Sequence, residues 1–107
     1  MILVDEHSIS SSEEFSGSLQ ALGRATIVGS QTPGICLVMN IKTLPSGTIL
    51  AYPIAEGQTR DGRVLENNGV VPDIEVALDR AQLLQGKDTQ LEAAINFLEQ
   101  GTVIPDE

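Results

Sequence analysis

Hydrophobic and polar positions along the chain predict a short strand that leads directly into a helix. Residues 2–4 form an apolar run, typical of a strand buried on both faces, and the polar residues 5–8 end it. Between residues 11 and 22 apolar residues recur at helical spacing. We therefore expect a helix whose core-facing stripe consists of Phe15, Leu19 and Leu22.

The start of this helix carries a capping signal. Serine precedes glutamate by three residues in two overlapping pairs, Ser10 with Glu13 and Ser11 with Glu14, and either pair can form a capping box. Gly23 fits the position just past the helix end. A hydroxyl at such a strand-to-helix junction lies where unpaired N–H groups and the positive end of the helix dipole converge, which suits a nucleophile and its oxyanion donors.

Strand and turn signals fill the middle of the chain. A second short strand is expected at residues 25–28. Residues 36–42 and 48–54 flank a Leu-Pro-Ser-Gly turn and predict a β-hairpin. The extended segment 70–76 contains a proline, which restricts it to a sheet edge or a strand start.

Two helical segments close the chain. Residues 79–84 predict a short helical turn and residues 89–100 a regular helix, with Thr89 and Glu92 as its capping box. The order β-α-β, hairpins, helix predicts one mixed α/β domain over residues 1–107. The buried stripe of the last helix is expected to be Leu91, Ala94, Ile95 and Leu98.

Composition supports a folded protein and limits the classes of partner that it can bind. Apolar residues make up 41% of the chain, and acidic residues outnumber basic ones by 15 to 6. The formal charge of −9 argues against nucleic acids and anionic membranes, because phosphate binding needs clustered cations. No apolar run approaches the roughly 20 residues of a membrane helix. The only histidine, His7, and the only cysteine, Cys36, make no metal-ligand set, so we expect no metal and no cofactor.

Three segments together resemble one enzyme family. Residues 4–13 run from a strand through an acidic residue and small residues to a glutamate and a helix. Residues 24–34 follow the pattern (R)A-x-(I/V)-V-G-x-x-T-x-G, and residues 66–73 contain G-(V/I)-x-P-D. In this order over residues 2–76 they resemble the S41 peptidases, the C-terminal processing (tail-specific) proteases and their tricorn-core relatives. The resemblance implies a partial crotonase/ClpP-like β-α-β spiral with hairpins and a C-terminal helix.

Carried over to matching positions, the resemblance implies specific site residues. It places the nucleophile at Ser10, one oxyanion donor at the N–H of Ser11, and the supporting glutamate of the tricorn-like branch at Glu66. Loss of one oxyanion donor typically costs about 3 kcal/mol of transition-state stabilisation. The alternative for Ser10 is a helix N-cap, worth about 1 kcal/mol. The alternative for Glu66 is an exposed turn carboxylate.

The chain departs from the processing proteases at the general base. Those enzymes carry a lysine directly after the T-x-G glycine, whereas this chain has Ile35, whose side chain accepts no proton. The first lysine, Lys42, falls in the predicted hairpin, and His7 is better explained as a strand-end residue. In the tricorn-like branch an upstream histidine activates the serine. We therefore expect the base and a second oxyanion donor before Met1, and a chain that is catalytically incomplete alone.

Three functions are open at this stage. The first is a serine-type peptidase of the S41 kind, acting on peptide or protein substrates through an acyl-enzyme. The second is a binding module like the retinoid and fatty-acid carriers of the same superfamily, and the third is an inert structural domain. The resemblance favours the peptidase and an extracytoplasmic location, although the compartment is undecided. An exposed strand edge predicts a homo-oligomer or pairing with a missing N-terminal part.

Overall fold

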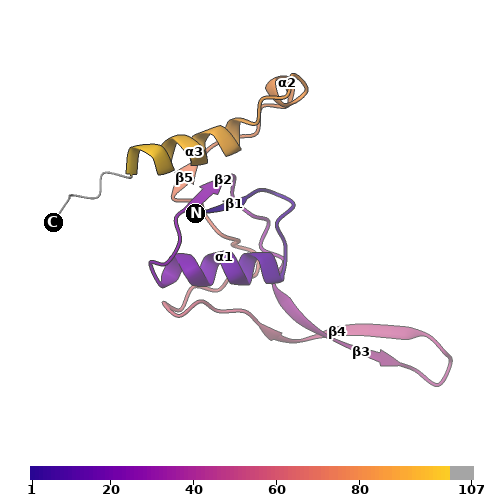
Figure 1. Cartoon of the computed structure of the whole chain (residues 1–107). Helices are drawn as coiled ribbons and strands as arrows, with labels where there is room; N and C mark the ends of the chain where they lie inside the picture. The colour runs from indigo at the N-terminus through magenta and orange to yellow at the C-terminus, as the bar shows by residue number, and fades with distance from the viewer. Residues whose placement is uncertain (102–107) are drawn as a thin grey trace.

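The computed structural model describes residues 1–101, and its elements follow the predicted order, which confirms the mixed α/β class (Figure 1). None of the helices within this range has the length and apolar character needed to span a bilayer. A loose tail is expected for residues 102–107, but these lie outside the described residues. The helices and strands are β1 (Ile2–Val4), α1 (Ser11–Ala21), β2 (Ile27–Gly29), β3 (Leu37–Thr43), β4 (Ile49–Glu56), β5 (Ile74–Glu75), α2 (Arg80–Leu83) and α3 (Thr89–Gly101).

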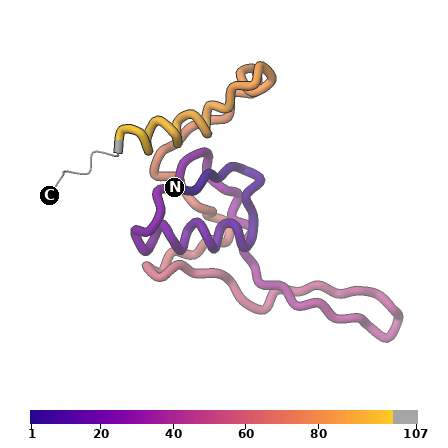
Figure 2. Tube along the Cα trace, viewed as in Figure 1, coloured from indigo at the N-terminus to yellow at the C-terminus, as the bar shows by residue number. Residues whose placement is uncertain are grey.

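Three short parallel strands form the centre of the fold in the order β1-β2-β5. Ile2 pairs with Ile27, and Val28 pairs with Ile74. α1 and α3 lie on opposite sides of this sheet, and the N-terminus lies between them (Figures 1 and 2). The expectation that the first strand is buried on both faces is wrong, since Leu3 is 43% exposed. β1 pairs only with β2, so it is an edge strand rather than a central one.

α1 packs through its small residues rather than through the predicted apolar stripe. Gly17 is buried, and a methyl group added there would come within 3.2–3.4 Å of side chains in segment 59–70. Phe15 is 62% and Leu22 45% exposed, and Leu19 is half-buried. The stripe prediction is therefore wrong for this helix. Segment 59–70 crosses the opposite flank, where the absence of a side chain at Gly17 allows close approach.

The predicted core stripe of α3 is also largely exposed. Ala94 is 6% exposed, but Leu91, Ile95 and Leu98 are between 44% and 54% exposed. α3 contacts β1 and β2. These strands have three residues each, too few to bury one face of a 13-residue helix.

The cap of α3 differs from the prediction as well. The carboxylate of Asp88 accepts the N–H groups of Gln90 and Leu91, both at 3.0 Å, so Asp88 rather than Thr89 satisfies the helix start. The Thr89 hydroxyl instead donates to the carbonyl of Ala77 at 3.1 Å. Thr89 therefore ties α3 to the chain segment after β5. At α1, by contrast, the Glu13 half of the predicted Ser10–Glu13 capping box is present, since the Glu13 carboxylate accepts the Ser10 N–H at 3.0 Å, while the Glu13 N–H donates to the Ser10 carbonyl at 2.8 Å.

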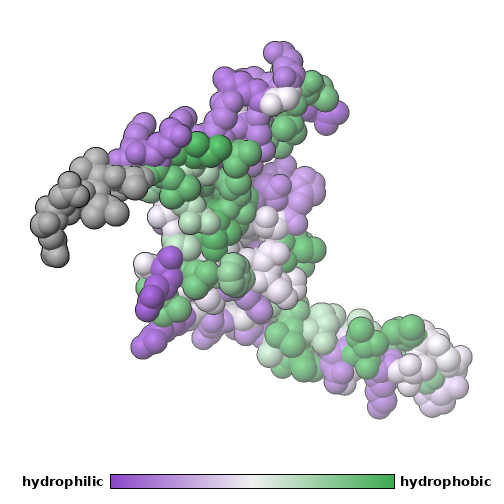
Figure 3. All heavy atoms as spheres, viewed as in Figure 1, coloured by the Kyte–Doolittle hydropathy of each residue, from purple (hydrophilic) through white to green (hydrophobic). Residues whose placement is uncertain are grey.

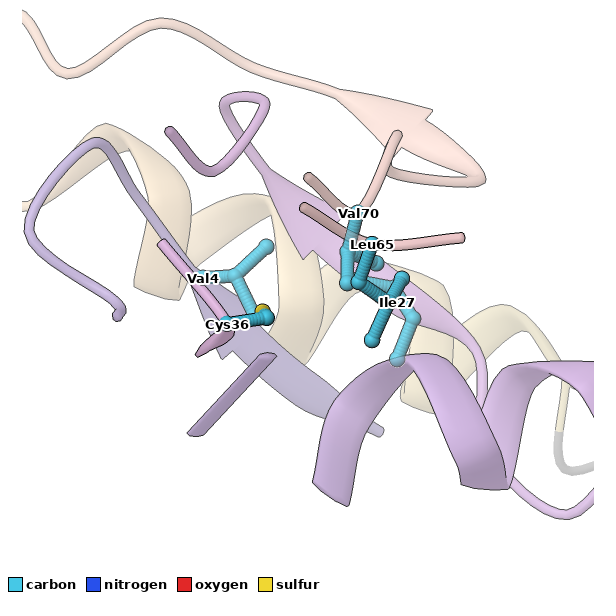
Figure 4. Close-up of a cluster of buried hydrophobic side chains, with 5 residues drawn as sticks. All are labelled: Val4, Ile27, Cys36, Leu65 and Val70. Carbon is cyan, nitrogen blue, oxygen red and sulfur yellow. The ribbon is translucent and has the colours of Figure 1, made fainter. Parts of the chain in front are cut away.

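A small aliphatic core joins the segments around the first helix (Figure 4). It draws on β1, β2, the residues before β3 and the turn region 65–70. Burial of one aliphatic side chain typically stabilises a fold by about 1.5–3 kcal/mol. The core therefore fixes these segments relative to one another. Its members, each at most 4% exposed, are Val4, Ile27, Cys36, Leu65 and Val70.

The predicted hairpin is confirmed, with bounds shifted by one or two residues. β3 and β4 pair antiparallel and project away from the sheet (Figure 1). Side chains on directly paired residues share one face of a hairpin. One such face is apolar and open to solvent, with Ile41 68% and Ile49 69% exposed, and Figure 3 shows the apolar colouring along this arm. This apolar hairpin face consists of Met39, Ile41, Thr43, Ile49, Ala51 and Pro53.

Both outer edges of the hairpin are interrupted near their middle. The N–H of Leu44 bonds to the carbonyl of Thr48 at 2.8 Å, which fixes the alternation of hydrogen-bonded pairs. Pro53 then falls at a position where a backbone N–H would point away from β3, and proline has none. On the other edge, Ile41 of β3, which pairs with Ala51, donates its N–H to the side-chain oxygen of Asn40 at 2.9 Å. Each edge therefore lacks a free donor at this point.

Candidate active site

Ser10 lies between the loop after β1 and the first residue of α1. It is exposed, and its backbone has φ 57° and ψ −123°, a region that non-glycine residues seldom occupy. The Ser10 carbonyl accepts the N–H groups of Glu13 at 2.8 Å and of Glu14 at 3.1 Å. The first helical turn is thus closed by backbone contacts, and the hydroxyl is presented at the surface rather than among packed aliphatics.

The N–H of Ser11 is available as a hydrogen-bond donor. Ser11 is the first residue of α1, and the first N–H groups of a helix have no intrahelical acceptor. No acceptor for this group lies within residues 1–101. The positive end of the helix dipole favours negative charge at this point. Such a donor can stabilise an oxyanion formed beside the Ser10 hydroxyl.

A buried carboxylate, that of Glu13, joins the Ser10 turn to the loop before β3. Glu13 is 0% exposed. No lysine, arginine or histidine lies within ion-pair distance of it in the described part of the chain. Hydrogen bonds replace the missing counter-charge. Their donors, at 2.5 to 3.2 Å, are the N–H groups of Ser10, Gly34 and Ile35, the Thr32 hydroxyl and the Cys36 thiol.

These donors set the protonation of the buried groups. Burial raises the pKa of Glu13, but the hydrogen bonds from Thr32, Cys36 and two backbone N–H groups outweigh burial and lower the pKa. For Cys36, burial and then the hydrogen bond and charge of Glu13 raise the pKa to about 12. Glu13 is therefore a carboxylate and Cys36 a neutral thiol at neutral pH. Cys36 is thus a small core side chain that also donates to Glu13.

Glu66 is anchored to the same loop. Its carboxylate accepts the N–H of Cys36 at 2.7 Å, and it is half-buried rather than fully exposed. Ser10 donates its own N–H to the carbonyl of Ile35 at 2.9 Å, so Ser10 and Glu66 bind adjacent residues of one loop. Asn67, next to Glu66, has φ 60°. Among the described residues, Ser10 and Asn67 are the two non-glycine residues with positive φ.

The side chains considered as bases do not contact Ser10. Ile35 is 56% exposed beside the Ser10 turn and accepts no proton. The His7 side chain is 83% exposed, and its Nδ1 lies 3.8 Å from Asp5 and 3.9 Å from Glu6. Lys42 lies in β3 on the projecting hairpin. His7 with Asp5 and Glu6 could offer three ligand atoms to a metal ion, but these are surface groups, and exposed acidic groups of this kind are common without a metal.

Two surface hollows lie away from Ser10. One of about 280 Å³ lies beside Gly23, Arg24 and Asp73, and another of about 390 Å³ beside Arg63 and Asn68. Ser10 lines neither of them. Any cleft that places a substrate against the Ser10 hydroxyl therefore needs walls beyond these two hollows.

The role of Glu13 is the feature that sequence reasoning missed. The sequence identifies Glu13 as half of a capping box, and its carboxylate accepts the Ser10 N–H at 3.0 Å, which fits that prediction. The other donors come from the Thr-Pro-Gly loop about twenty residues later. A buried carboxylate needs several donors, and the polar Thr32 close to a glycine in this loop was the available signal.

Comparison with known proteins gives a consistent result. The family model of peptidase family S41 matches residues 1–76. A probable CtpA-like serine protease of Staphylococcus epidermidis is 32% identical over 83 residues, which are 78% of this chain and 17% of that protein. The corresponding Staphylococcus aureus protein is 34% identical over the same length, with the same coverage. The chain thus spans less than a fifth of these relatives.

Solved structures show the same fold. The tricorn protease matches with a TM-score of 0.80 and 35% identity, covering 90% of this chain and 10% of that one. The photosystem II D1 C-terminal processing protease matches with a TM-score of 0.61 and 32% identity, covering 69% of this chain and 19% of that one. The arrangement of strands and helices is therefore shared with these proteins.

Proposed function

The chain belongs to peptidase family S41, and on this premise we propose that it forms part of a serine peptidase with Ser10 as nucleophile. The observation that carries the proposal is the exposed Ser10 at the start of α1, held in an unusual backbone conformation. Residues kept in such conformations cost about 1–3 kcal/mol each and cluster at active sites. An ordinary N-cap needs only an extended backbone.

The proposed chemistry follows the two-step route of serine peptidases. The Ser10 hydroxyl oxygen bonds to the carbonyl carbon of a peptide substrate while its proton passes to a general base. The N–H of Ser11 donates to the oxygen that becomes negative. The base then gives the proton to the departing amine as the C–N bond breaks. Water attacks the remaining ester, restores the Ser10 hydroxyl and releases the acid product.

We propose that the general base comes from outside residues 1–101, so that the chain is catalytically incomplete alone. The support is the aliphatic Ile35 beside the Ser10 turn and the lack of a contact between His7 and Ser10 in this range. Glu66 is proposed to orient that base. One oxygen of its carboxylate, Oε2, accepts the N–H of Cys36, so the other oxygen can accept a hydrogen bond from the base.

The partners proposed are a peptide or protein substrate and the remainder of an S41 catalytic domain, of which residues 1–107 form the C-terminal part. The apolar hairpin face supports a further protein contact, because an isolated two-stranded hairpin is marginally stable in water. The rest of the catalytic domain or a second copy of the chain would cover it. Size-exclusion chromatography with and without Ile41→Asp separates a dimer held by this face from a monomer.

Labelling with a fluorophosphonate probe tests the nucleophile. In the full-length polypeptide that carries these residues, the probe should label the protein, and Ser10→Ala should abolish labelling. Ser12→Ala is the matched control, since Ser12 lies one position beyond Ser11 on the same helical turn. Absence of labelling in a folded full-length protein would refute the peptidase. Saturable binding of a fatty acid or retinoid without labelling would instead favour a carrier.

A further inference from the structure

We propose that Glu13 is a positioning residue of this site, whose buried carboxylate holds the Ser10 turn and the Glu66 turn in one fixed relation. The inference rests on the proposed roles of Ser10 and Glu66, because a residue that acts through others is defined by what it positions. Beyond those roles, we infer that Ser10 and Glu66 belong to a single structural unit held together by the Glu13 side chain.

The first link runs directly to the nucleophile. Glu13 Oε2 accepts the N–H of Ser10 at 3.0 Å and the N–H of Ile35 at 2.9 Å. The Ser10 N–H also reaches the Ile35 carbonyl at 2.9 Å. The Ser10 backbone is thus held from two sides in a conformation that it would not adopt freely. This geometry sets the direction of the Ser10 hydroxyl.

Two further links run to the Glu66 turn. Glu13 Oε1 accepts the Thr32 hydroxyl at 2.5 Å, and Thr32 exchanges two bonds with Val70, at 2.7 Å and 3.1 Å. Glu13 Oε2 accepts the Cys36 thiol at 3.2 Å, and the Cys36 N–H donates to Glu66 at 2.7 Å. The turn that carries Glu66 is therefore connected to Glu13 on both of its sides.

The carboxylate at position 13 is chemically specific. Every group that faces it is a donor, so both of its oxygens must accept. A glutamine of the same shape would place an NH₂ group against N–H or O–H donors. Aspartate is one methylene shorter and would withdraw from part of the set. Neither variant can hold the two turns as Glu13 does.

The test compares Glu13→Gln with Glu14→Gln in the full-length polypeptide. Glu14 lies one position later in the same helical turn and makes none of the five contacts, so it controls for the loss of one charge. We expect the second-order rate of fluorophosphonate labelling to fall about 100-fold in Glu13→Gln, the scale of an ångström misplacement, and to change less than about threefold in Glu14→Gln. With a peptide substrate, kcat should fall while KM stays near its wild-type value.

The outcomes separate this inference from the proposed function. If wild-type protein is not labelled, the peptidase proposal fails. If wild-type and folded Glu13→Gln proteins are labelled at the same rate, Glu13 positions nothing and this inference fails. If Glu13→Gln does not fold, Thr32→Val decides, because it removes one donor and leaves the carboxylate. Measured well below its melting temperature, it should be labelled about 10-fold more slowly than Thr32→Ser, and equal rates would overturn the inference.

Discussion

The hydroxyl of Thr32 is the contact whose removal gives the sharpest thermodynamic prediction. It donates to Glu13 at 2.5 Å and accepts the N–H of Val70 at 2.7 Å, and Thr32 is 3% exposed. Thr32→Val keeps the shape of the side chain but removes both bonds. Thr32→Ser keeps the hydroxyl and removes only a methyl group, so it is the matched control.

The expected loss follows from the two groups left behind. A buried N–H without a partner costs about 1–3 kcal/mol, and loss of a hydrogen bond to a charged group costs about 1.5–3 kcal/mol. Together, Thr32→Val should lower the free energy of unfolding by about 2.5–6 kcal/mol. Thr32→Ser should lower it by about 1 kcal/mol, the cost of one buried methyl group. The difference is a large share of the 5–15 kcal/mol typical of a small domain.

Urea unfolding at neutral pH, followed by far-UV circular dichroism, measures both variants. Thr32→Val should show a much lower midpoint with an unchanged slope, because the surface exposed on unfolding is the same. Equal midpoints for the valine and serine variants would show that the hydroxyl does not connect Glu13 to the 65–70 region. A changed slope would mean that the folded state itself was altered.

Further predictions concern the backbone, the helix cap and pH. Gly29→Ala should destabilise by about 3–5 kcal/mol in thermal melts, because its φ is +130° and a Cβ would overlap the carbonyl oxygen of Val4, whereas Gly47→Ala, at an open turn, should cost about 1–2 kcal/mol. Asp88→Ala should cost about 1 kcal/mol by the same melts, since it removes the cap of α3. The folded pKa of Glu13 lies below 4.5, so its contribution to stability is present above pH 4.5 and is lost as pH falls through the folded pKa. The folded pKa of Cys36 is raised from 9.0 to about 12. Its contribution to stability is therefore present below pH 9.0, and the free energy of unfolding falls by at most about 4 kcal/mol as pH rises towards 12. Urea midpoints against pH should show both losses, and Cys36→Ser should remove the alkaline one.

Local signals predicted the elements well, because each depends on neighbouring residues. The Ser10–Glu13 pair and the Leu-Pro-Ser-Gly hairpin turn both work within a few positions. Burial was predicted less well, because it depends on which segment lies against a helix. The small flank of α1 at Gly17 packs against segment 59–70, and the apolar stripe beginning at Phe15 is left exposed.

At the candidate site, too, local features could be predicted from the sequence, and features that depend on the three-dimensional path of the chain could not. Motif order indicated Ser10 and Glu66, whose roles stay predictions, and it gave no reason to expect both at adjacent residues of one loop. The gathering of donors on Glu13 depends on the path of the chain between β2 and β3. Spacing along a sequence carries no information about that path, so the organising carboxylate emerges only in three dimensions.

The interrupted edges of the hairpin bear on how the protein behaves when concentrated. A long apolar ribbon with complete rows of donors is a template on which identical strands stack into fibrils. Pro53 and the Asn40 side chain break both rows at mid-length. We therefore expect the hairpin to expose apolar side chains such as Ile41 and Ile49 to a protein partner with less tendency to form cross-β fibrils than an uninterrupted hairpin would have.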